Sequence, residues 1–323
     1  MACLLIGLAC VLLARAVHPW APALSPLLLA GVAWRNLAAV PPALSPGVAV
    51  AAKPVLRAGI VLLGLQLALP DELGLGPGVL ALVVATVALT FGAAVVLGRA
   101  LRLPDDLVLL VASGFSICGA AAVAGTDSVV RARREMAATA IALVVLFGTL
   151  MIPLMPALTG ALGLPDRAAG IWIGASTHEV AQVVAAGGLV GAEALQVAVL
   201  VKLARVLMLA PVLAGLGWRQ RRRDTLVPHD DGAPTAARPP LVTWFVVGFV
   251  ALMLVRSTGL VPTGVLDAAA LVQQLLLAAS MVALGLGVDL RSIARLGPKP
   301  LVLGTGATAV AVAVGGAGAA LLG

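Results

Sequence analysis

The segment that decides the fold is AAGIWIGASTHEVAQVVAAGGLV, residues 168–190, where polar and ionisable residues interrupt an apolar run of membrane-spanning length. An α-helix needs about 20 apolar residues to cross the hydrocarbon core of a bilayer. A histidine and a glutamate side by side in such a segment are costly unless a pathway or a partner uses them. The stretch therefore predicts a membrane-embedded helix that is broken at functional residues.

The rest of the chain has the composition of a membrane protein. Of its 323 residues, 61% are hydrophobic and 11% are charged, whereas a typical soluble domain has about 25% charged residues. This composition excludes a water-soluble globular enzyme. The apolar runs are continuous, so their backbone groups must be satisfied within helices, which excludes an alternating β-barrel. We predict an all-α polytopic membrane protein.

Apolar segments follow one another along the whole chain, and about nine to eleven of them are expected to enter the membrane. They cover approximately residues 2–17, 24–40, 48–69, 78–97, 107–130, 136–158, 168–190, 194–216, 241–255, 266–288 and 301–322. The polar stretch 218–240 combines Arg, Pro and acidic residues, as a flexible linker does. We predict one transporter domain over residues 1–323, with 218–240 as a cytoplasmic linker loop.

One internal repeat relates two distant parts of the sequence. Residues 60–80 align without gaps on residues 281–301, with nine identical positions that include Gly64/Gly285 and the Gly-Pro pairs at 76–77 and 297–298. Repeats of this kind commonly relate two inverted halves of a transporter. We therefore expect inverted repeats.

The distribution of basic residues gives an orientation. Cytoplasmic loops of inner-membrane proteins carry an excess of Lys and Arg. More of these residues lie on the cytoplasmic side if the segments 107–130 and 168–190 are re-entrant hairpins, each entering and leaving on one face. We prefer this arrangement to broken spanning helices. It puts the N-terminus in the cytoplasm of a bacterial cell and makes the two hairpin tips meet near the midplane.

The first interrupted segment contains SGFSICGAAAVAGTDS, residues 113–128. Glycine lets the backbone leave helical geometry, and a broken helix frees N–H groups that favour anions. Ser116, Cys118 and Gly119 are therefore candidate substrate-binding residues. The alternative is close helix packing through small residues.

The second interrupted segment supplies Ser176, His178 and Gln182 as further candidate substrate-binding residues. On a continuous helix, His178 and Gln182 would lie one turn apart on the same face. His178 and Glu179 are the expected carriers of a coupling proton, since imidazole titrates near physiological pH and burial disfavours a charged carboxylate. The alternative is a surface loop at His178, with Glu179 as a helix-start residue.

Lys202 and Arg205 interrupt an apolar helix three residues apart, hence on one face. This pattern favours a buried, paired role in substrate binding, in which Arg205 could hold an oxyanion bidentately. Snorkelling to the interface is the alternative for either residue alone. Asp127 is a further candidate for ion coupling, although its proximity to Arg131 also fits an ordinary pairing at a helix end.

The candidate residues carry more positive than negative charge, which favours an anionic substrate over a sodium ion. Cys3, Cys10 and Cys118 have no metal-ligand or redox spacing, so we expect no metal and no cofactor. The net charge of +7 lies mostly between apolar runs, and it is an orientation signal rather than evidence for nucleic acid. The expected partners are a small anion, the lipid bilayer and, in a homodimer, a second copy of the chain.

Several motifs resemble the YeiH-type sulfate exporter family of bacterial inner membranes. They are GVAWRNL (31–37), AGIVLLGLQLAL (58–69), SICGAAAVA (116–124), GASTHEVAQVVAAGG (174–188) and VKLARVLMLAP (201–211). The resemblance runs in order along nearly the whole chain. It implies a secondary transporter with inverted repeats and interrupted helices.

The predicted function is export of a small oxyanion, such as sulfate or an organic sulfonate, by proton-coupled alternating access. One alternative is a sodium- or proton-coupled exchanger that uses Asp127 and Glu179. Another is an intramembrane thiol enzyme with Cys118 as nucleophile and His178 as base. A passive channel is the third. We expect that the protein is not an enzyme.

Overall fold

The ordered elements are helical throughout the part of the chain that the structure, a computed structural model, describes. This part comprises residues 24–38, 41, 44–66, 68, 74–226, 244–286, 291 and 297–323. Helices long and apolar enough to cross a membrane cover Pro77–Ala100, Arg134–Ala161, Ala192–Arg222, Thr263–Ser280 and Lys299–Leu322. Large apolar side chains such as Leu89 and Leu150 are exposed on them, as expected where lipid is the solvent. The predicted all-α polytopic membrane fold is confirmed.

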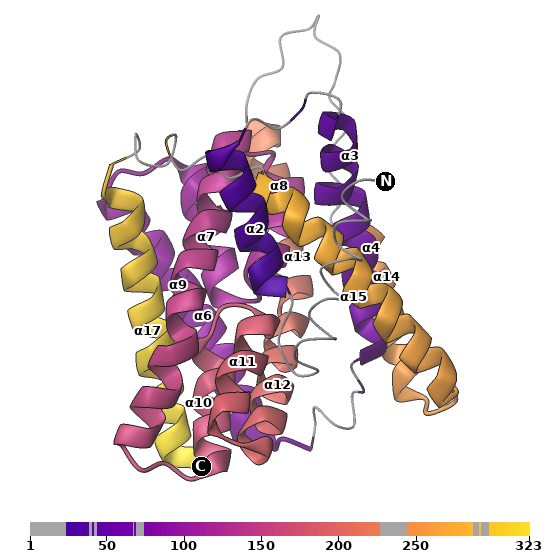
Figure 1. Ribbon diagram of the computed structural model, residues 1–323. Coiled ribbons are helices and arrows are strands. Elements are labelled where there is room, and N and C mark those ends of the chain that lie inside the picture. The colour runs from indigo at the N-terminus through magenta and orange to yellow at the C-terminus, as the bar shows by residue number, and fades with distance from the viewer. Residues whose placement is uncertain are drawn as a thin grey trace, which may run out of the picture.

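The helices form two packed groups (Figure 1). The first, the core bundle, contains α6 (Pro77–Ala100), α7 (Asp105–Ser116), α8 (Ala120–Val130), α9 (Arg134–Ala161), α10 (Asp166–Ser176), α11 (Val180–Val190), α12 (Ala192–Leu207), α13 (Leu209–Leu226) and α17 (Lys299–Leu322). The second, the flanking bundle, contains α2 (Leu24–Leu37), α3 (Ser45–Val50), the π-helix η2 (Ala51–Val55), α4 (Leu56–Leu63), the 3-10 helix η3 (Gly64–Gln66), α14 (Trp244–Ser257) and α15 (Thr263–Leu286).

The first interrupted segment is a hairpin of α7 and α8. The Thr126 hydroxyl, in α8, donates a hydrogen bond of 2.8 Å to the Ser113 hydroxyl, in α7. Thirteen residues of uninterrupted helix would separate these groups by about 20 Å. Helix α8 therefore folds back along α7 after the break at residues 117–119.

The second interrupted segment, α10 and α11, is also a hairpin. Gly191, just after α11, lies against the Asp166 carboxylate at the start of α10, since a Cβ atom at Gly191 would be 2.8 Å from that oxygen. The segment therefore enters and leaves on the same face of the molecule. Both segments form the hairpins that the distribution of basic residues favoured.

The two hairpins approach from opposite faces, as their contacts along the straight helix α17 show. Phe115 at the first tip packs near Gly304, whereas Ala168 at the base of the second hairpin packs near Gly323. His178, at the second tip, reaches Thr308 between them. Figure 1 shows α7 and α8 above α10 and α11.

Helix α12 begins at the base of the second hairpin and continues almost without interruption into α13. The latter runs along α8, where Leu209 and Leu213 pack against Gly125. The arginine-rich end of α13 therefore lies toward the same face as the arginines that follow α8.

The structure corrects the predicted start of the linker. The polar stretch was expected to begin at Trp218, but α13 remains helical to Leu226. Arg and Gln are good helix formers, and the Arg222 guanidinium packs 3.9 Å from the centre of the Trp218 ring. The rest of the linker, 227–240, lies outside the described residues, as does the first apolar segment, 2–17.

The two copies of the internal repeat match at their described ends. Gly76 and Gly297 have positive φ angles of 87° and 75°, and each precedes a helix of 24 residues. These helices, α6 and α17, pack antiparallel, with Leu97 against Gly306 and Leu82 against Gly318. Much of the middle of both copies lies outside the described residues, and the inverted relation of the halves stays a prediction.

The hairpin topology predicts which loops share a side of the membrane. In a variant lacking Cys3, Cys10 and Cys118, single cysteines replace Arg102 and Arg133, which flank the first hairpin, or Arg167 and Glu193, which flank the second. These four positions are exposed. A membrane-impermeant thiol reagent applied to oriented vesicles should label the first pair from one side and the second pair from the other. Labelling of R102C and R133C from opposite sides would contradict the hairpin.

Candidate functional site

The two helix breaks are short non-helical segments at the tips of the hairpins, a turn in the first and extended backbone in the second. In the first break Ile117 has φ −111° and ψ −89°, and Gly119 has φ 76°. A Cβ atom at position 119 would overlap the side chain of Glu179, so glycine is required there for both conformation and space. In the second break Thr177 and Glu179 are extended.

Lys202 joins the two breaks. Its ammonium group is fully buried and donates hydrogen bonds to the carbonyl oxygens of Ile117, at 2.7 Å, and Thr177, at 2.8 Å. These carbonyls lie just beyond the C-terminal ends of α7 and α10, where the helix dipoles place partial negative charge. One cation therefore neutralises both helix ends.

Arg205 also joins the two breaks, and all three nitrogens of its guanidinium donate hydrogen bonds. Its side chain is also fully buried. The acceptors are the carbonyls of Phe115, Ser116, Gly174, Ala175 and Thr177, at distances of 2.6 to 3.2 Å. The prediction of a buried, paired role for Lys202 and Arg205 is confirmed, with backbone carbonyls as the partners. Their role in binding the substrate stays a prediction.

Glu179 binds the N-terminal amide ends of the two helices that follow the breaks, α8 and α11. It is the N-cap of α11 and forms a capping box with Gln182, whose Oε1 accepts a 3.1 Å hydrogen bond from the Glu179 amide. The Oε1 of Glu179 accepts a 3.0 Å hydrogen bond from the Ala120 amide at the start of α8. A carboxylate is favoured at a helix N-terminus, and the Glu179 carboxylate caps the N-termini of two helices.

His178 lies in the break and not on the α11 helix, so it does not share a helical face with Gln182 as it would on a continuous helix. Its ring is buried, with the centroid 4.5 Å from that of Phe115 and Nε2 3.0 Å from the Thr308 hydroxyl. Nδ1 of this ring has no hydrogen-bond partner among the described residues. The imidazole thus has one nitrogen available for a proton or a ligand.

The remaining predicted substrate-binding residues lie around the same crossing. The Ser176 hydroxyl donates to the Ala311 carbonyl at 3.3 Å, and the Ser116 hydroxyl donates to the Ser113 carbonyl at 3.4 Å. The buried amide nitrogen of Gln182 has no partner among the described residues. Cys118 is buried on the side that faces the flanking bundle. The prediction that the two interrupted stretches meet is confirmed.

The charges at the crossing do not balance. The carbonyl ends of α7 and α10 contribute about −1 and the amide ends of α8 and α11 about +1, so the helix dipoles cancel. Lys202 and Arg205 then stand against one acidic side chain, Glu179. A small anion would complete this set of charges.

Comparisons with known proteins agree with this architecture. The sequence profile described as "Conserved hypothetical protein 698" matches residues 1–304. A UPF0324 membrane protein of Corynebacterium glutamicum is 46% identical over 314 residues, which cover 96% of this chain and 89% of that protein. The chain belongs to the UPF0324 family of membrane proteins. The resemblance to the YeiH-type family, predicted from the motifs, is thereby confirmed.

Other UPF0324 relatives cover most of the chain. One from Pseudomonas aeruginosa is 42% identical over 265 residues, 80% of this chain and 73% of its own length. The UPF0324 membrane protein TauZ of Paracoccus pantotrophus is 38% identical over 297 residues, 91% of this chain and 84% of its own length. No solved structure matches this UPF0324 chain.

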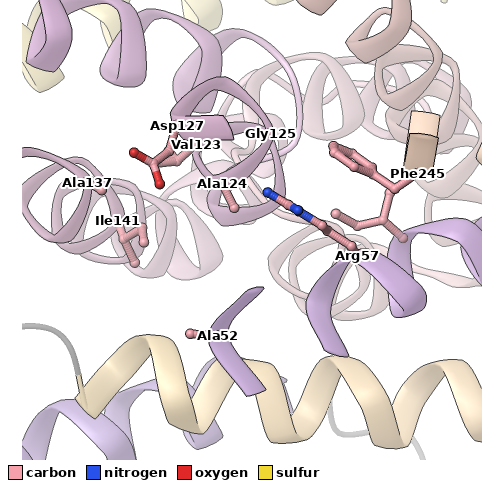
Figure 2. A pocket seen from close by; sticks show the side chains of 10 residues that line it. Ala52, Arg57, Val123, Ala124, Gly125, Asp127, Ala137, Ile141 and Phe245 are labelled. Atoms are coloured by element: carbon pink, nitrogen blue, oxygen red, sulfur yellow. The ribbon is translucent and has the colours of Figure 1, made fainter. Parts of the chain in front are cut away.

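A cavity of about 80 Å³ lies between the core bundle and the flanking bundle in this UPF0324 protein (Figure 2). Its wall includes Asp127 of α8 on one side and Arg57 of α4 on the other. Arg57 was missed in the sequence analysis, although a single arginine within the apolar segment 48–69 was a signal that could have found it. Thr308 and Phe115, the neighbours of His178, had no such signal, because Thr and Phe are ordinary in apolar helices.

The contacts of Arg205 predict a large loss of stability when its guanidinium is removed. Arg205→Met leaves buried carbonyls from both hairpins without a donor and should lower the free energy of unfolding by about 3 kcal/mol or more. Arg205→Lys should recover only part of this, since an ammonium cannot reach all the acceptors. Thermal unfolding in detergent provides the measurement, with exposed Arg99→Met as the control. Equal melting temperatures for R205M and the control would contradict the role.

Proposed function

We propose that this protein is a secondary active transporter of a small oxyanion, such as sulfate or an organic sulfonate, in the inner membrane of a bacterium. The single observation that carries the proposal is the crossing of two broken helices around Lys202, Arg205 and Glu179. Breaking a helix in a membrane exposes backbone groups that need other partners. Transporters use such breaks to form substrate and ion sites between half-helices.

The charge at the crossing supports an anionic substrate. The two buried cations outnumber the acidic side chain there, and a low dielectric constant makes this excess effective over several ångströms. Lys202 and Arg205 donate to carbonyls in the present conformation. In the proposal they offset the charge of the anion, while backbone amides, His178 and Gln182 near the breaks provide its hydrogen bonds.

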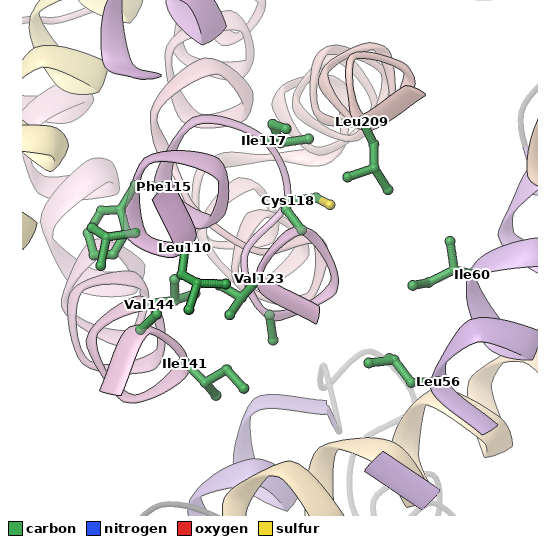
Figure 3. Packing of buried hydrophobic residues seen from close by; sticks show 14 of the residues in the cluster. Leu56, Ile60, Leu110, Phe115, Ile117, Cys118, Val123, Ile141, Val144 and Leu209 are labelled. Carbon is green, nitrogen blue, oxygen red and sulfur yellow. The ribbon is translucent and has the colours of Figure 1, made fainter. Parts of the chain in front are cut away.

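The interface between the bundles supports alternating access. It is mostly apolar, with Leu56 and Ile60 of the flanking bundle opposite Val123, Cys118 and neighbouring residues of the core bundle (Figure 3). Such an interface has few directional bonds to break when one bundle moves past the other. The core bundle, with its crossing, would move against the flanking bundle.

Glu179 is the residue on which we place proton coupling. Its carboxylate holds the amide ends of both hairpins, so its protonation would weaken two charge-assisted hydrogen bonds at once. His178 is a second acceptor beside it. Export is the direction that we propose.

The proposal is tested with the purified protein in liposomes. Sulfate or sulfonate uptake should respond to an imposed pH gradient, and Glu179→Gln should reduce the gradient-driven rate by about tenfold or more, because each 1.4 kcal/mol of lost interaction is a factor of ten. His178→Ala should reduce it as well, with exposed Glu193→Gln as the control. Gradient-driven flux that is unchanged in both variants, each confirmed as folded by size-exclusion chromatography, would refute the coupling.

A thiol enzyme is a different reading of Cys118 and His178, and the geometry disfavours it. Of the hydrogen bonds among described residues, none joins the Cys118 thiol to the His178 ring, whose Nε2 faces Thr308 on another helix. Cys118→Ala should therefore keep most of the wild-type flux. Loss of all function in this variant, with the fold intact, would favour the enzyme.

A further inference from the structure

The Glu179 carboxylate lies where a small oxyanion would be well bound. Its Oε1 accepts the Ala120 amide of α8 at 3.0 Å, and the side chain also accepts the Gln182 amide in the first turn of α11. Both helices have eleven residues, and helix N-termini carry partial positive charge that favours anions. The two breaks therefore direct two anion-binding helix ends at one acid group, which belongs to the protein itself.

Unpaired polar atoms flank this acid group in the second break and in the first turn of α11. Among the described residues, the Thr177 hydroxyl, Nδ1 of His178 and the Gln182 amide nitrogen have no hydrogen-bond partner. All three side chains are fully buried, and a buried donor without an acceptor is costly. These atoms point to a ligand with more acceptor oxygens than the two of a carboxylate.

The unpaired amide of Gln182 lies beside the carboxylate, because both side chains pack against the same face of α9. A Cβ atom at Gly119 would meet the side chains of Glu179 and Val144. A Cβ atom at Gly148 would overlap the Gln182 amide. Val144 and Gly148 are one turn apart on α9. An oxyanion in the place of the carboxylate would therefore have a further donor within reach.

Charge decides whether the carboxylate and an anion can be bound together. The charged and titratable groups around Glu179 are Lys202 and Arg205 of α12, His178 beside it in the chain and Cys118 of the first break. A carboxylate and a divalent oxyanion together would exceed the two positive charges of α12, and they would compete for the same amides. A divalent oxyanion with a protonated Glu179 leaves no net charge, which an interior of low dielectric constant favours.

We propose that the Glu179 carboxylate and the transported anion occupy the amide ends of α8 and α11 alternately, so that a divalent oxyanion such as sulfate binds only when Glu179 is protonated. The carboxylate caps both helices while the site is empty. The proton enters from the same aqueous phase as the anion, and the neutral side chain then leaves the amides to the oxyanion and Gln182. The inference rests on the proposed function, and it narrows the substrate to a divalent oxyanion carried with one proton.

This pairing determines the net charge that crosses the membrane. One proton carried with a divalent anion leaves one negative charge to be transported. The potential of a bacterial membrane, negative inside, drives such a charge outward. The inference therefore agrees with the proposed direction, export.

The first test uses the wild-type protein and inorganic sulfate. Calorimetric titrations at neutral and at alkaline pH, each in two buffers of different ionisation enthalpy, give the number of protons taken up with the anion. Sulfate binding should take up about one proton where Glu179 is ionised in the free protein, and the affinity should fall about tenfold for each unit of rise in pH there. Binding without proton uptake at both pH values would overturn the proposal.

Glu179→Gln separates occupation of the site from support of its structure. Glutamine has no carboxylate to displace, so the variant should bind sulfate about tenfold or more tightly than the wild type at alkaline pH and without proton uptake, although its pH-driven flux falls. Exposed Glu193→Gln is the matched control and should bind as the wild type does. Weaker binding by E179Q than by the wild type, at an unchanged melting temperature, or proton uptake that survives in E179Q would overturn the proposal.

Liposome flux separates this inference from the proposed function. With equal pH on both sides, an inside-negative potassium diffusion potential of about 100 mV should raise the outside-to-inside ratio of sulfate about fifty-fold, as expected for one net negative charge. Electroneutral flux, or the larger ratio expected for two charges, would overturn the coupling to one proton and leave the anion transporter standing. Absence of flux for every anion tested would overturn the proposed function itself.

Discussion

The donation of hydrogen bonds from one helix to the backbone carbonyls of two broken hairpins is the interaction on which the structure depends. Lys202 and Arg205, one turn apart on α12, are needed as donors because helix ends inside a membrane have no water with which to form hydrogen bonds. Without them, the carbonyls of Phe115, Ser116, Ile117, Gly174, Ala175 and Thr177 would lose these donors in the interior. Glu179 performs the complementary task for the amide ends. The chemistry of the site and the stability of the fold thus share the same side chains.

Much of this arrangement could be predicted from the sequence. The breaks near Cys118 and His178 were signalled by glycines and polar residues within apolar runs, and Lys202 and Arg205 by their spacing on one helix face. The preference for hairpins followed from the arginines after α8 and at the end of α13. These signals are local or statistical, so they can be interpreted without knowledge of which distant segments are in contact.

The partners of these residues could not be predicted in the same way. Arg205 bonds to carbonyls 28 to 90 residues earlier in the chain, and every residue has a carbonyl, so no side chain marks the acceptors. The spacing of four residues between His178 and Gln182 indicated a shared face only if the helix were continuous. The capping box at Glu179 instead starts the helix after the imidazole. The position of Arg57 in the same cavity wall as Asp127 could not be predicted either, because it arises only in the folded structure.

The shared anchoring of both tips on α12 also limits how the molecule can move. Neither hairpin can move alone without breaking the hydrogen bonds between its carbonyls and Lys202 or Arg205. Both hairpins must therefore move together with α12 as one rigid body. In the proposed transport cycle, conformational change would then be confined to sliding or rocking along the apolar interface beside Leu56 and Ile60. A cross-link across this interface would stop that cycle and leave the crossing itself undisturbed.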